Sequence, residues 1–172
     1  MHQESTLDVI RRRRTIRKYH TDAVPEDVVK QLLEAAMCAP SAGDEKPWDF
    51  IVCTDRAVLD KIEGAHPYAF MMKQVPAAIV VCCDMKLEHL KNHAVLGCSA
   101  AVENILIAAE SLKLGAAWLG IYPEADRIGN FKKLFGLPEH IMPFALVPLG
   151  HPGEEKLMKD RFDPARVHNN KW

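Results

Sequence analysis

The sequence lacks the short motifs that identify several large classes of enzyme. It contains no GxGxxG dinucleotide fingerprint, no Walker phosphate loop, no GxSxG nucleophile elbow and no HExxH pair. Cysteine is sparse, and its spacing matches no zinc site. The cysteines have apolar neighbours, which predicts buried, reduced thiols in a cytoplasmic protein without a metal site; they are Cys38, Cys53, Cys82, Cys83 and Cys98.

Long apolar runs and an excess of charge of one sign are absent too. No stretch of about 18 uncharged apolar residues occurs, so we expect no transmembrane helix. The polar segment 1–8 lacks the apolar centre of a secretory signal. The 22 basic and 23 acidic residues give a formal net charge of -1. This balance predicts no general attraction to nucleic acid or to a membrane surface.

The residues that are present can build one folded domain over 1–172, because 48% of them are hydrophobic and 26% are charged. Apolar periodicity predicts helices at 6–13 with Thr6 as N-cap, from Pro25 to the stop at Pro40, and at 58–64, 94–114 and 125–135. Strands are predicted at 49–53, 77–83, 115–121 and 144–149. Helices and strands alternate along the chain, which indicates an α/β or α+β class.

Two predicted segments suggest contacts beyond an ordinary core. The helix at 94–114 is apolar all round, so it must be buried from several sides, either in the central core or at a subunit interface. The segment 152–172 has too few apolar residues for a core of its own. We expect it to lie across another surface, and the partner subunit is one candidate.

Four segments carry residues that can bind a ligand, and the first two precede the first strand. The basic run at 11–18 offers Arg13, Thr15 and Arg17 to a phosphate, because a guanidinium group binds phosphate through paired hydrogen bonds. The alternative is a solvated cationic helix end. Small residues at 39–48 would let a flat ligand approach the backbone closely. The alternative there is an ordinary loop anchored by a core tryptophan.

The other two segments lie in the second half of the chain. Taken alone, 114–123 is a buried strand that ends at a glycine. Lys159 and Arg161 are two residues apart, so on an extended segment they point the same way and could close over an anion. The alternative for this pair is a solvated tail.

The order and spacing of these segments resemble the nitroreductase family. The segments are RRTIR near the N-terminus, APSAGDEKPW, a long helix followed by LGAAWLG, and a late KDR. The resemblance covers about 7–172 and includes the ending RVHNNKW. It implies a homodimer with a mixed central sheet flanked by helices, and two FMN molecules in clefts between the subunits.

The resemblance also assigns residues to the cofactor. Arg13, Arg14, Thr15 and Arg17 would hold the phosphate, ribityl chain and pyrimidine edge of FMN. Lys159 and Arg161 would reach the phosphate from the other side. Pro40, Ser41 and Ala42 would be laid against the flavin by the partner subunit. Leu119 and Gly120, next to Trp118, would offer backbone N–H groups near flavin N5 and O4.

Three positions depart from the family pattern. Asp44 stands where the family usually has Asn, and Lys46 stands where it usually has Gln. A carboxylate accepts hydrogen bonds but repels a negatively charged reduced flavin, and the lysine could offset that charge. Lys113 replaces a common Gly, which we interpret as a surface change.

The implied reaction takes a hydride from NADH or NADPH onto flavin N5, and a flat organic acceptor, such as a nitroaromatic or a quinone, then takes the electrons from the same face. This is a ping-pong scheme that needs no catalytic side chain, since the cofactor does the chemistry. One alternative is a flavin-binding redox sensor or FMN store; another is a basic-patch module without cofactor. Other activities of the family need lid segments, and the one candidate, 66–74, could equally be a core helix.

Overall fold

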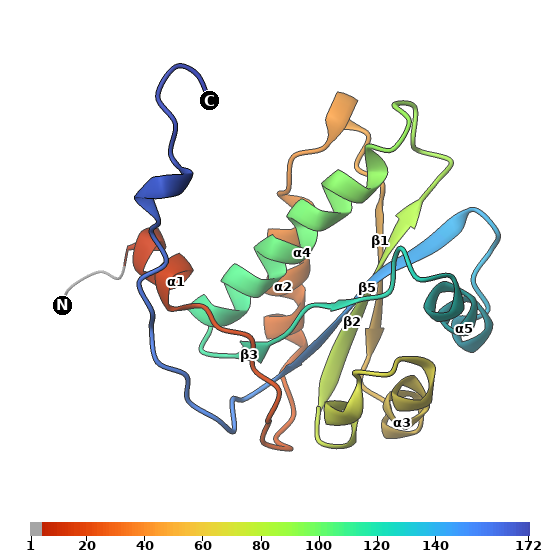
Figure 1. The fold of residues 1–172 in the computed structure, drawn as a ribbon. Helices are drawn as coiled ribbons and strands as arrows, with labels where there is room; N and C mark the ends of the chain where they lie inside the picture. Colours follow the sequence, from red (N-terminus) through yellow and green to blue (C-terminus); the bar gives the residue numbers. More distant parts are fainter. Residues whose placement is uncertain (1–4) are drawn as a thin grey trace.

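A computed structural model describes residues 5–172, so residues 1–4 of the polar N-terminal segment lie outside the described part. Its centre is a five-stranded sheet in the order β1-β2-β5-β3, with β4 paired to β5 beside that path (Figure 1). The strands are β1 (Trp48–Cys53), β2 (Ala77–Asp84), β3 (Gly115–Ala116), β4 (Leu119–Gly120) and β5 (Ile141–Gly150). All these strand pairs are antiparallel, and Thr15 adds one isolated parallel bridge to Ala116.

Of the five α-helices in the described residues, four cover the two faces of the sheet. The five are α1 (Thr6–Arg12), α2 (Glu26–Met37), α3 (Arg56–Ala65), α4 (Ala94–Ser111) and α5 (Ala125–Phe135), and short 3-10 helices stand at Ala42–Asp44, Phe70–Lys73 and Pro164–Arg166. Helix α1 packs on α4. In Figure 1, α2 and α4 lie on one side of the sheet, and α3 and α5 lie on the other. The predicted α+β class is confirmed.

Strand β2 explains why both faces need helices. Ile79 and Val81 join the core made with α2 and α4, whereas Val80 joins the core made with α3 and α5. Successive side chains of a strand point to opposite faces, so an unbroken apolar run is buried on both sides. Every residue of β2 up to Cys83 is buried.

The ends of several helices differ from the predictions because capping side chains decide them. Ser5, not Thr6, caps α1 by accepting the Asp8 N–H. Asp55 caps α3 in the same way, so that helix begins two residues before the predicted start. Gly64 was expected to end α3 but lies inside it. Of the apolar residues of α1, Val9 is buried, whereas Leu7 and Ile10 are exposed.

The predicted strand at 115–121 is wrong in one respect, because it is interrupted after Ala116 and resumes at Leu119. Both parts keep one register on β5, with Ala116 opposite Leu149 and Leu119 opposite Leu146. Continuing that register sets Ala117 opposite Pro148, which has no N–H to donate. The proline therefore divides the strand into β3 and β4.

Helix α4 is shorter than predicted and is a core helix. It ends at Ser111, and Lys113 takes the left-handed conformation (φ 61°) that often terminates a helix. That geometry favours glycine, which explains physically why the proteins that this sequence resembles often have Gly at this position. By length and composition α4 is apolar enough to cross a membrane. Eight of its residues are nevertheless buried in the protein, including Cys98, Val102 and Ile105.

The thiol prediction is confirmed for four cysteines and wrong for Cys38, which is exposed at the end of α2. No cysteine of the described chain forms a disulfide. The Sγ atoms of Cys83 and Cys98 lie 3.0 Å apart, where β2 meets α4. The hydrogen bond with Cys83, followed by burial in the apolar layer, raises the pKa of Cys98 far above its ordinary value.

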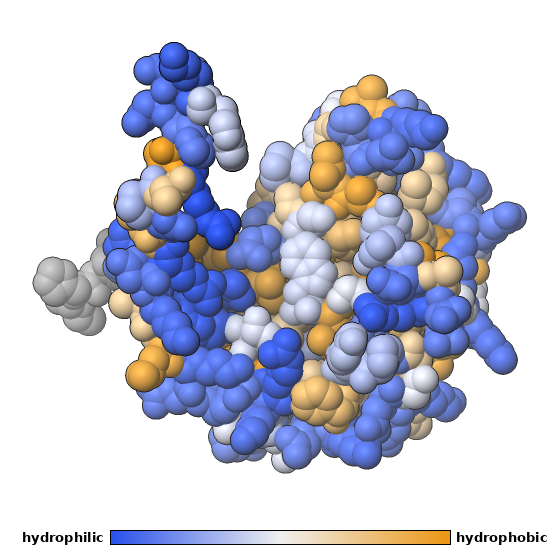
Figure 2. Space-filling view, viewed as in Figure 1, coloured by the Kyte–Doolittle hydropathy of each residue, from blue (hydrophilic) through white to orange (hydrophobic). Residues whose placement is uncertain are grey.

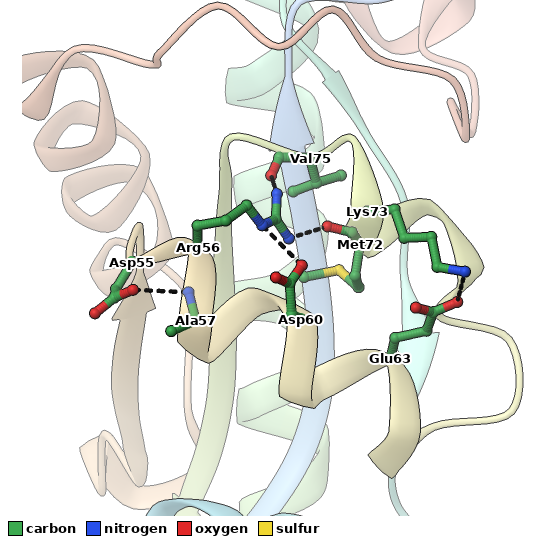
Figure 3. A network of polar contacts seen from close by, with 8 residues as sticks. All are labelled: Asp55, Arg56, Ala57, Asp60, Glu63, Met72, Lys73 and Val75. Atoms are coloured by element: carbon green, nitrogen blue, oxygen red, sulfur yellow. Dashed lines mark hydrogen bonds and ion pairs between the residues drawn. The ribbon is translucent and has the colours of Figure 1, made fainter.

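A polar network fixes the connection between α3 and β2 (Figure 3). Arg56 at the start of α3 donates to the backbone carbonyls of Met72 and Val75 and pairs with Asp60 at 2.9 Å. It thereby satisfies carbonyl groups that no strand or helix uses. Lys73 reaches back to Glu63 at 3.2 Å, so the segment between the two elements is held at both ends.

Candidate functional site

The first predicted motif lies along β3. Ile16 N donates to the Ala116 carbonyl at 2.9 Å, which places Thr15 and Arg17 on either side of this contact. The approach requires glycine in β3, because a Cβ on Gly115 would stand 2.8 Å from Cγ2 of Ile16. The first and third motifs, far apart in sequence, are therefore neighbours in the fold.

The C-terminal segment is tied to the same motif by side chains that the sequence interpretation missed. Glu154 Oε1 accepts the N–H groups of Arg17 at 2.6 Å and Lys18 at 3.3 Å. Lys156 Nζ donates to the Thr15 carbonyl at 2.6 Å. The N–H of Arg17 is the main reason that the pKa of Glu154 lies below its ordinary value. Neither Glu154 nor Lys156 belongs to a sequence pattern that would have singled it out.

These connections leave a cavity of about 770 Å³ between α1 and the C-terminal segment. In Figure 2 this segment stands off from the body of the protein, with a hollow between them. Four of the predicted cofactor ligands line the cavity together: Arg13, Arg14, Lys159 and Arg161. Apolar side chains from both walls complete it, among them Ile10, Met158 and Phe162. Arg17 is exposed and is not part of this lining.

The guanidinium groups in the cavity differ in how far they are already engaged. Arg13 Nε lies 3.5 Å from Glu103 of α4, which with Asp160 is one of two acidic residues in the lining that a bound anion would face. Arg14 donates to the carbonyls of Arg11, Arg13 and Leu157. Its remaining nitrogen, Nη2, is buried and has no hydrogen-bond partner in the described part of the chain. A buried donor without a partner is costly, and an oxyanion would satisfy it.

The second motif, Pro40 to Lys46, lies at the N-terminal end of α4. Ser41 packs at Gly97, where a Cβ would be 3.4 Å from the serine Cβ, whereas Glu103, further along the same helix, lines the cation cavity. Gly97 and Glu103 are about 9 Å apart along the helix axis at 1.5 Å per residue. No residue from 40 to 46 lines the cavity, so the second motif is not part of it within the described chain.

The backbone of the second motif is strained and internally bonded. Gly43, Asp44 and Lys46 have positive φ angles of 58°, 58° and 49°. Ser41 Oγ accepts the Lys46 N–H at 2.9 Å, and Lys46 Nζ pairs with Asp44 at 2.9 Å. The two residues of this motif that depart from the family pattern thus neutralise each other. Pro40 is exposed, and Ser41 and Ala42 are half-buried.

The third motif presents an aromatic group and an open glycine. Trp118 packs edge-on against Phe144 at 5.9 Å, and Tyr122 stacks on the same ring at 6.2 Å. Leu119 is buried, whereas Gly120 is half-buried. The nearest atom to a Cβ on Gly120 would be the Tyr122 carbonyl at 3.6 Å, which is an ordinary contact. The chain itself therefore does not require glycine at this position.

Two side chains hold the carbonyl of Gly120, and the sequence interpretation missed both. His66 Nε2 lies 2.9 Å from this oxygen, and Arg127 Nη1 donates to it at 2.8 Å. Tyr68 N donates to His66 Nδ1 at 3.2 Å, so Nδ1 carries no proton and Nε2–H is the donor toward Gly120. His66 is 2% exposed and is the only polar residue of the described chain in the buried core.

The segment 66–74 is partly core and partly surface. Met71 and Met72 are buried in the 3-10 helix Phe70–Lys73, which agrees with the core interpretation. Tyr68 and Phe70 are exposed by about 60% and 58%. Arg127 lies over the Tyr68 ring at 5.4 Å, so this residue connects the segment to the Gly120 contact.

Acidification should destabilise the protein through His66. Its pKa lies below the ordinary value of 6.5, first because of burial and also because the Arg127 charge faces it, although the Gly120 hydrogen bond partly opposes both. The unfolded chain therefore binds a proton at His66 before the folded chain does. Stability from this group is complete above pH 6.5 and falls as the pH is lowered toward the folded-state pKa.

Urea unfolding at about pH 7.5, 6.5 and 5.5 would measure this effect, with His66→Gln as the comparison. These values bracket the ordinary histidine pKa of about 6.5. The wild type should lose more stability than the variant between the last two pH values. Equal losses would show that His66 does not carry the dependence.

A family model and known proteins that are similar to this chain point to one family. The model of the nitroreductase family matches residues 10–78 and 64–151. A Methanothermobacter thermautotrophicus protein, provisionally named NADH dehydrogenase/NAD(P)H nitroreductase, is 51% identical over 96% of this chain and 87% of its own length.

Solved structures agree with the fold. A Parabacteroides distasonis structure with the same provisional name has a TM-score of 0.94 at 40% identity, over 99% of this chain and 100% of its own. A Desulfovibrio desulfuricans structure, described as a nitroreductase in complex with FMN, has a TM-score of 0.85 at 27% identity, over 99% of both chains. Since the family model and these relatives span most of the sequence, the chain belongs to the nitroreductase family.

Proposed function

We propose that this oxidoreductase of the nitroreductase family binds FMN, takes a hydride from NADH or NADPH and reduces a flat organic acceptor such as a nitroaromatic or a quinone. The proposed scheme is ping-pong, with both substrates using one exposed face. The proposal draws on the family, on relatives named for NAD(P)H nitroreductase activity and on one relative solved with FMN. The free cysteines of the chain suit a reducing compartment, and we propose that the protein is located in the cytoplasm.

The observation that carries the proposal is a cavity lined by five cations, four of which are predicted cofactor ligands. Arg13 and Arg14 come from the first motif, and Lys159 and Arg161 come from the C-terminal segment. Their geometry suits a phosphate monoester, because two walls contribute charge and the buried Arg14 Nη2 lacks a partner in the described chain. The same cavity contains Glu103, whose contact with Arg13 at 3.5 Å is long enough for an anion to displace.

Gly120 supports a flat ring near β4. Its missing side chain leaves space that no contact within the chain fills, and a planar ligand can use that space to approach the backbone. In this proposal the N–H groups of Leu119 and Gly120 face the reactive edge of the ring, and Thr15, Arg17 and Trp118 border it. Bound FMN supplies the hydride acceptor and the electron donor; the chain's residues bind it, orient it and exclude water.

The proposed unit is a homodimer with two equivalent sites. Since Pro40, Ser41 and Ala42 do not line the cation cavity of their own chain, a second copy would bring them to the flavin, together with Asp44 and Lys46. A groove of about 490 Å³ between α1, α2 and α4 offers an apolar surface, including Val9 and Ile107. The C-terminal segment, with Leu157, Phe162 and Trp172 exposed, would cross the partner.

An absorbance spectrum of the purified protein tests this function directly. Flavin bands should be present, or appear on adding FMN, and should bleach on adding NADH or NADPH under argon. Bands that persist with both nucleotides would favour a flavin sensor or FMN store instead. A protein that takes up no FMN would contradict the proposal altogether.

Replacing two proposed phosphate ligands, one from each wall of the cavity, should weaken FMN binding. Arg13→Ala with Arg161→Ala removes two charge-assisted contacts, each worth about 1.5–3 kcal/mol, so the FMN dissociation constant should rise by more than about 100-fold. Fluorescence titration with FMN measures it. Arg166→Ala is the matched control, because Arg166 is exposed and pairs only locally with Asp163 at 3.1 Å. Unchanged FMN affinity in the double variant would show that the phosphate lies elsewhere.

A charge in the helical groove should separate the subunits. Ile107→Arg places a cation in an apolar surface of α4, so the variant should elute from a sizing column as a monomer. It should also lose FMN, since each site would lack its second motif. Lys30→Ala, on the exposed side of α2, serves as the control. A monomeric variant that keeps stoichiometric FMN would contradict the intersubunit site.

A further inference from the structure

We propose that His66 and Arg127 are positioning residues for the reaction, which act by holding the carbonyl of Gly120 and thereby fixing the backbone of 119–120. The inference rests on the proposed function, because it takes this backbone as the border of the flavin's reactive edge. Neither residue lines the cation cavity, so neither belongs to the phosphate site.

The two donors reach one oxygen from separate elements. His66 directly follows α3 and donates from Nε2 at 2.9 Å. Arg127 belongs to the first turn of α5 and donates from Nη1 at 2.8 Å. Since α3 and α5 pack on the same face of the sheet, their relative position determines where this carbonyl points. One neutral and one charged donor on a single acceptor hold its peptide plane firmly.

Gly120 needs this constraint more than other residues of the sheet. Glycine has no side chain that limits its backbone angles. Strand β4 contains only two residues and pairs with β5 alone. The glycine that gives a ligand close access therefore also loosens the strand, and the two hydrogen bonds supply the order that the strand lacks.

The donors are themselves held through Tyr68. Its backbone N–H fixes the tautomer of His66 at 3.2 Å, and its ring lies 5.4 Å beneath the Arg127 guanidinium. Phe131 closes the other side of the imidazole, edge-on at 6.4 Å. Because His66 is 2% exposed, it cannot touch a substrate, and its action must pass through Gly120.

Arg127 adds an electrostatic effect that His66 does not. Its positive charge lies one hydrogen bond from Gly120, where it favours extra negative charge on a ligand at this backbone. Arg127→Met should therefore lower the midpoint potential of bound FMN. Arg127→Lys keeps the charge and a donor, so it should restore most of the wild-type potential.

The experiment measures FMN uptake, the midpoint potential and the single-turnover rate of flavin reduction by NADH or NADPH. Both His66→Leu and Arg127→Met should still bind FMN, because the phosphate ligands are intact. Both should slow flavin reduction by about 10- to 100-fold, which is the usual effect when the reacting groups are slightly misplaced. Only Arg127→Met should lower the potential.

Arg56→Met is the matched control. Arg56 also holds two backbone carbonyls, those of Met72 and Val75, but it contacts the turn before β2 instead of β4 (Figure 3). It should lower thermal stability and leave both the potential and the rate unchanged. If His66→Leu fails to fold, Arg127→Met and Arg127→Lys carry the test, because Arg127 is only half-buried.

The outcomes separate this inference from the proposed function. A wild type that binds no FMN overturns both. A wild type that binds FMN and is reduced, with variants of unchanged potential and rate, leaves the function standing and overturns the positioning roles. Equal effects of Arg56→Met and Arg127→Met on the potential would also overturn them, since general loosening would then be the cause.

Discussion

The structure depends most on the pairing of β5 with three other strands. This strand joins β2 at the centre of the sheet and carries both β3 and β4 on its other edge. It then leads directly into the C-terminal segment, where Glu154 and Lys156 hold the first motif. Strand β5 therefore positions three segments that are far apart in the sequence. They are the basic segment near the N-terminus, the glycine of β4 and the C-terminal segment.

The structure on the two sides of this strand is stabilised by different interactions. The layers against β2 are apolar and bury every residue up to Cys83, so this part of the fold is stabilised by the hydrophobic effect and close packing. At the edge beyond β5 the strands are short, and individual polar contacts add to the packing, as at the Gly120 carbonyl and the Thr15 carbonyl. A rigid core beside an edge held by individual hydrogen bonds is a suitable arrangement for a ligand that needs close backbone contact.

The separation of the second motif from the cation cavity gives the single chain an incomplete site. Ser41 packs at Gly97 near the start of α4, whereas Arg13 pairs with Glu103 in the middle of that helix. No residue from 40 to 46 lines the cavity to which Arg13 belongs. This geometry, together with the apolar groove on α4, connects the proposed cofactor site to dimerisation: a subunit alone would have the phosphate ligands without the segment that covers the ring.

Local patterns in the sequence predict several parts of the fold. Periodicity predicts α5 at its exact bounds and β2 to within one residue. Residue chemistry made Arg13, Lys159 and Arg161 candidate anion ligands, the family resemblance added Arg14, and the fold brings these four to one cavity. Long-range contacts are seen only in the folded chain. Pro148 interrupts a strand about 30 residues away in sequence because β5 faces it, a distance beyond any local signal. His66 and Arg127 have no motif, and their shared target on Gly120 exists only because α3 and α5 pack side by side on one face of the sheet.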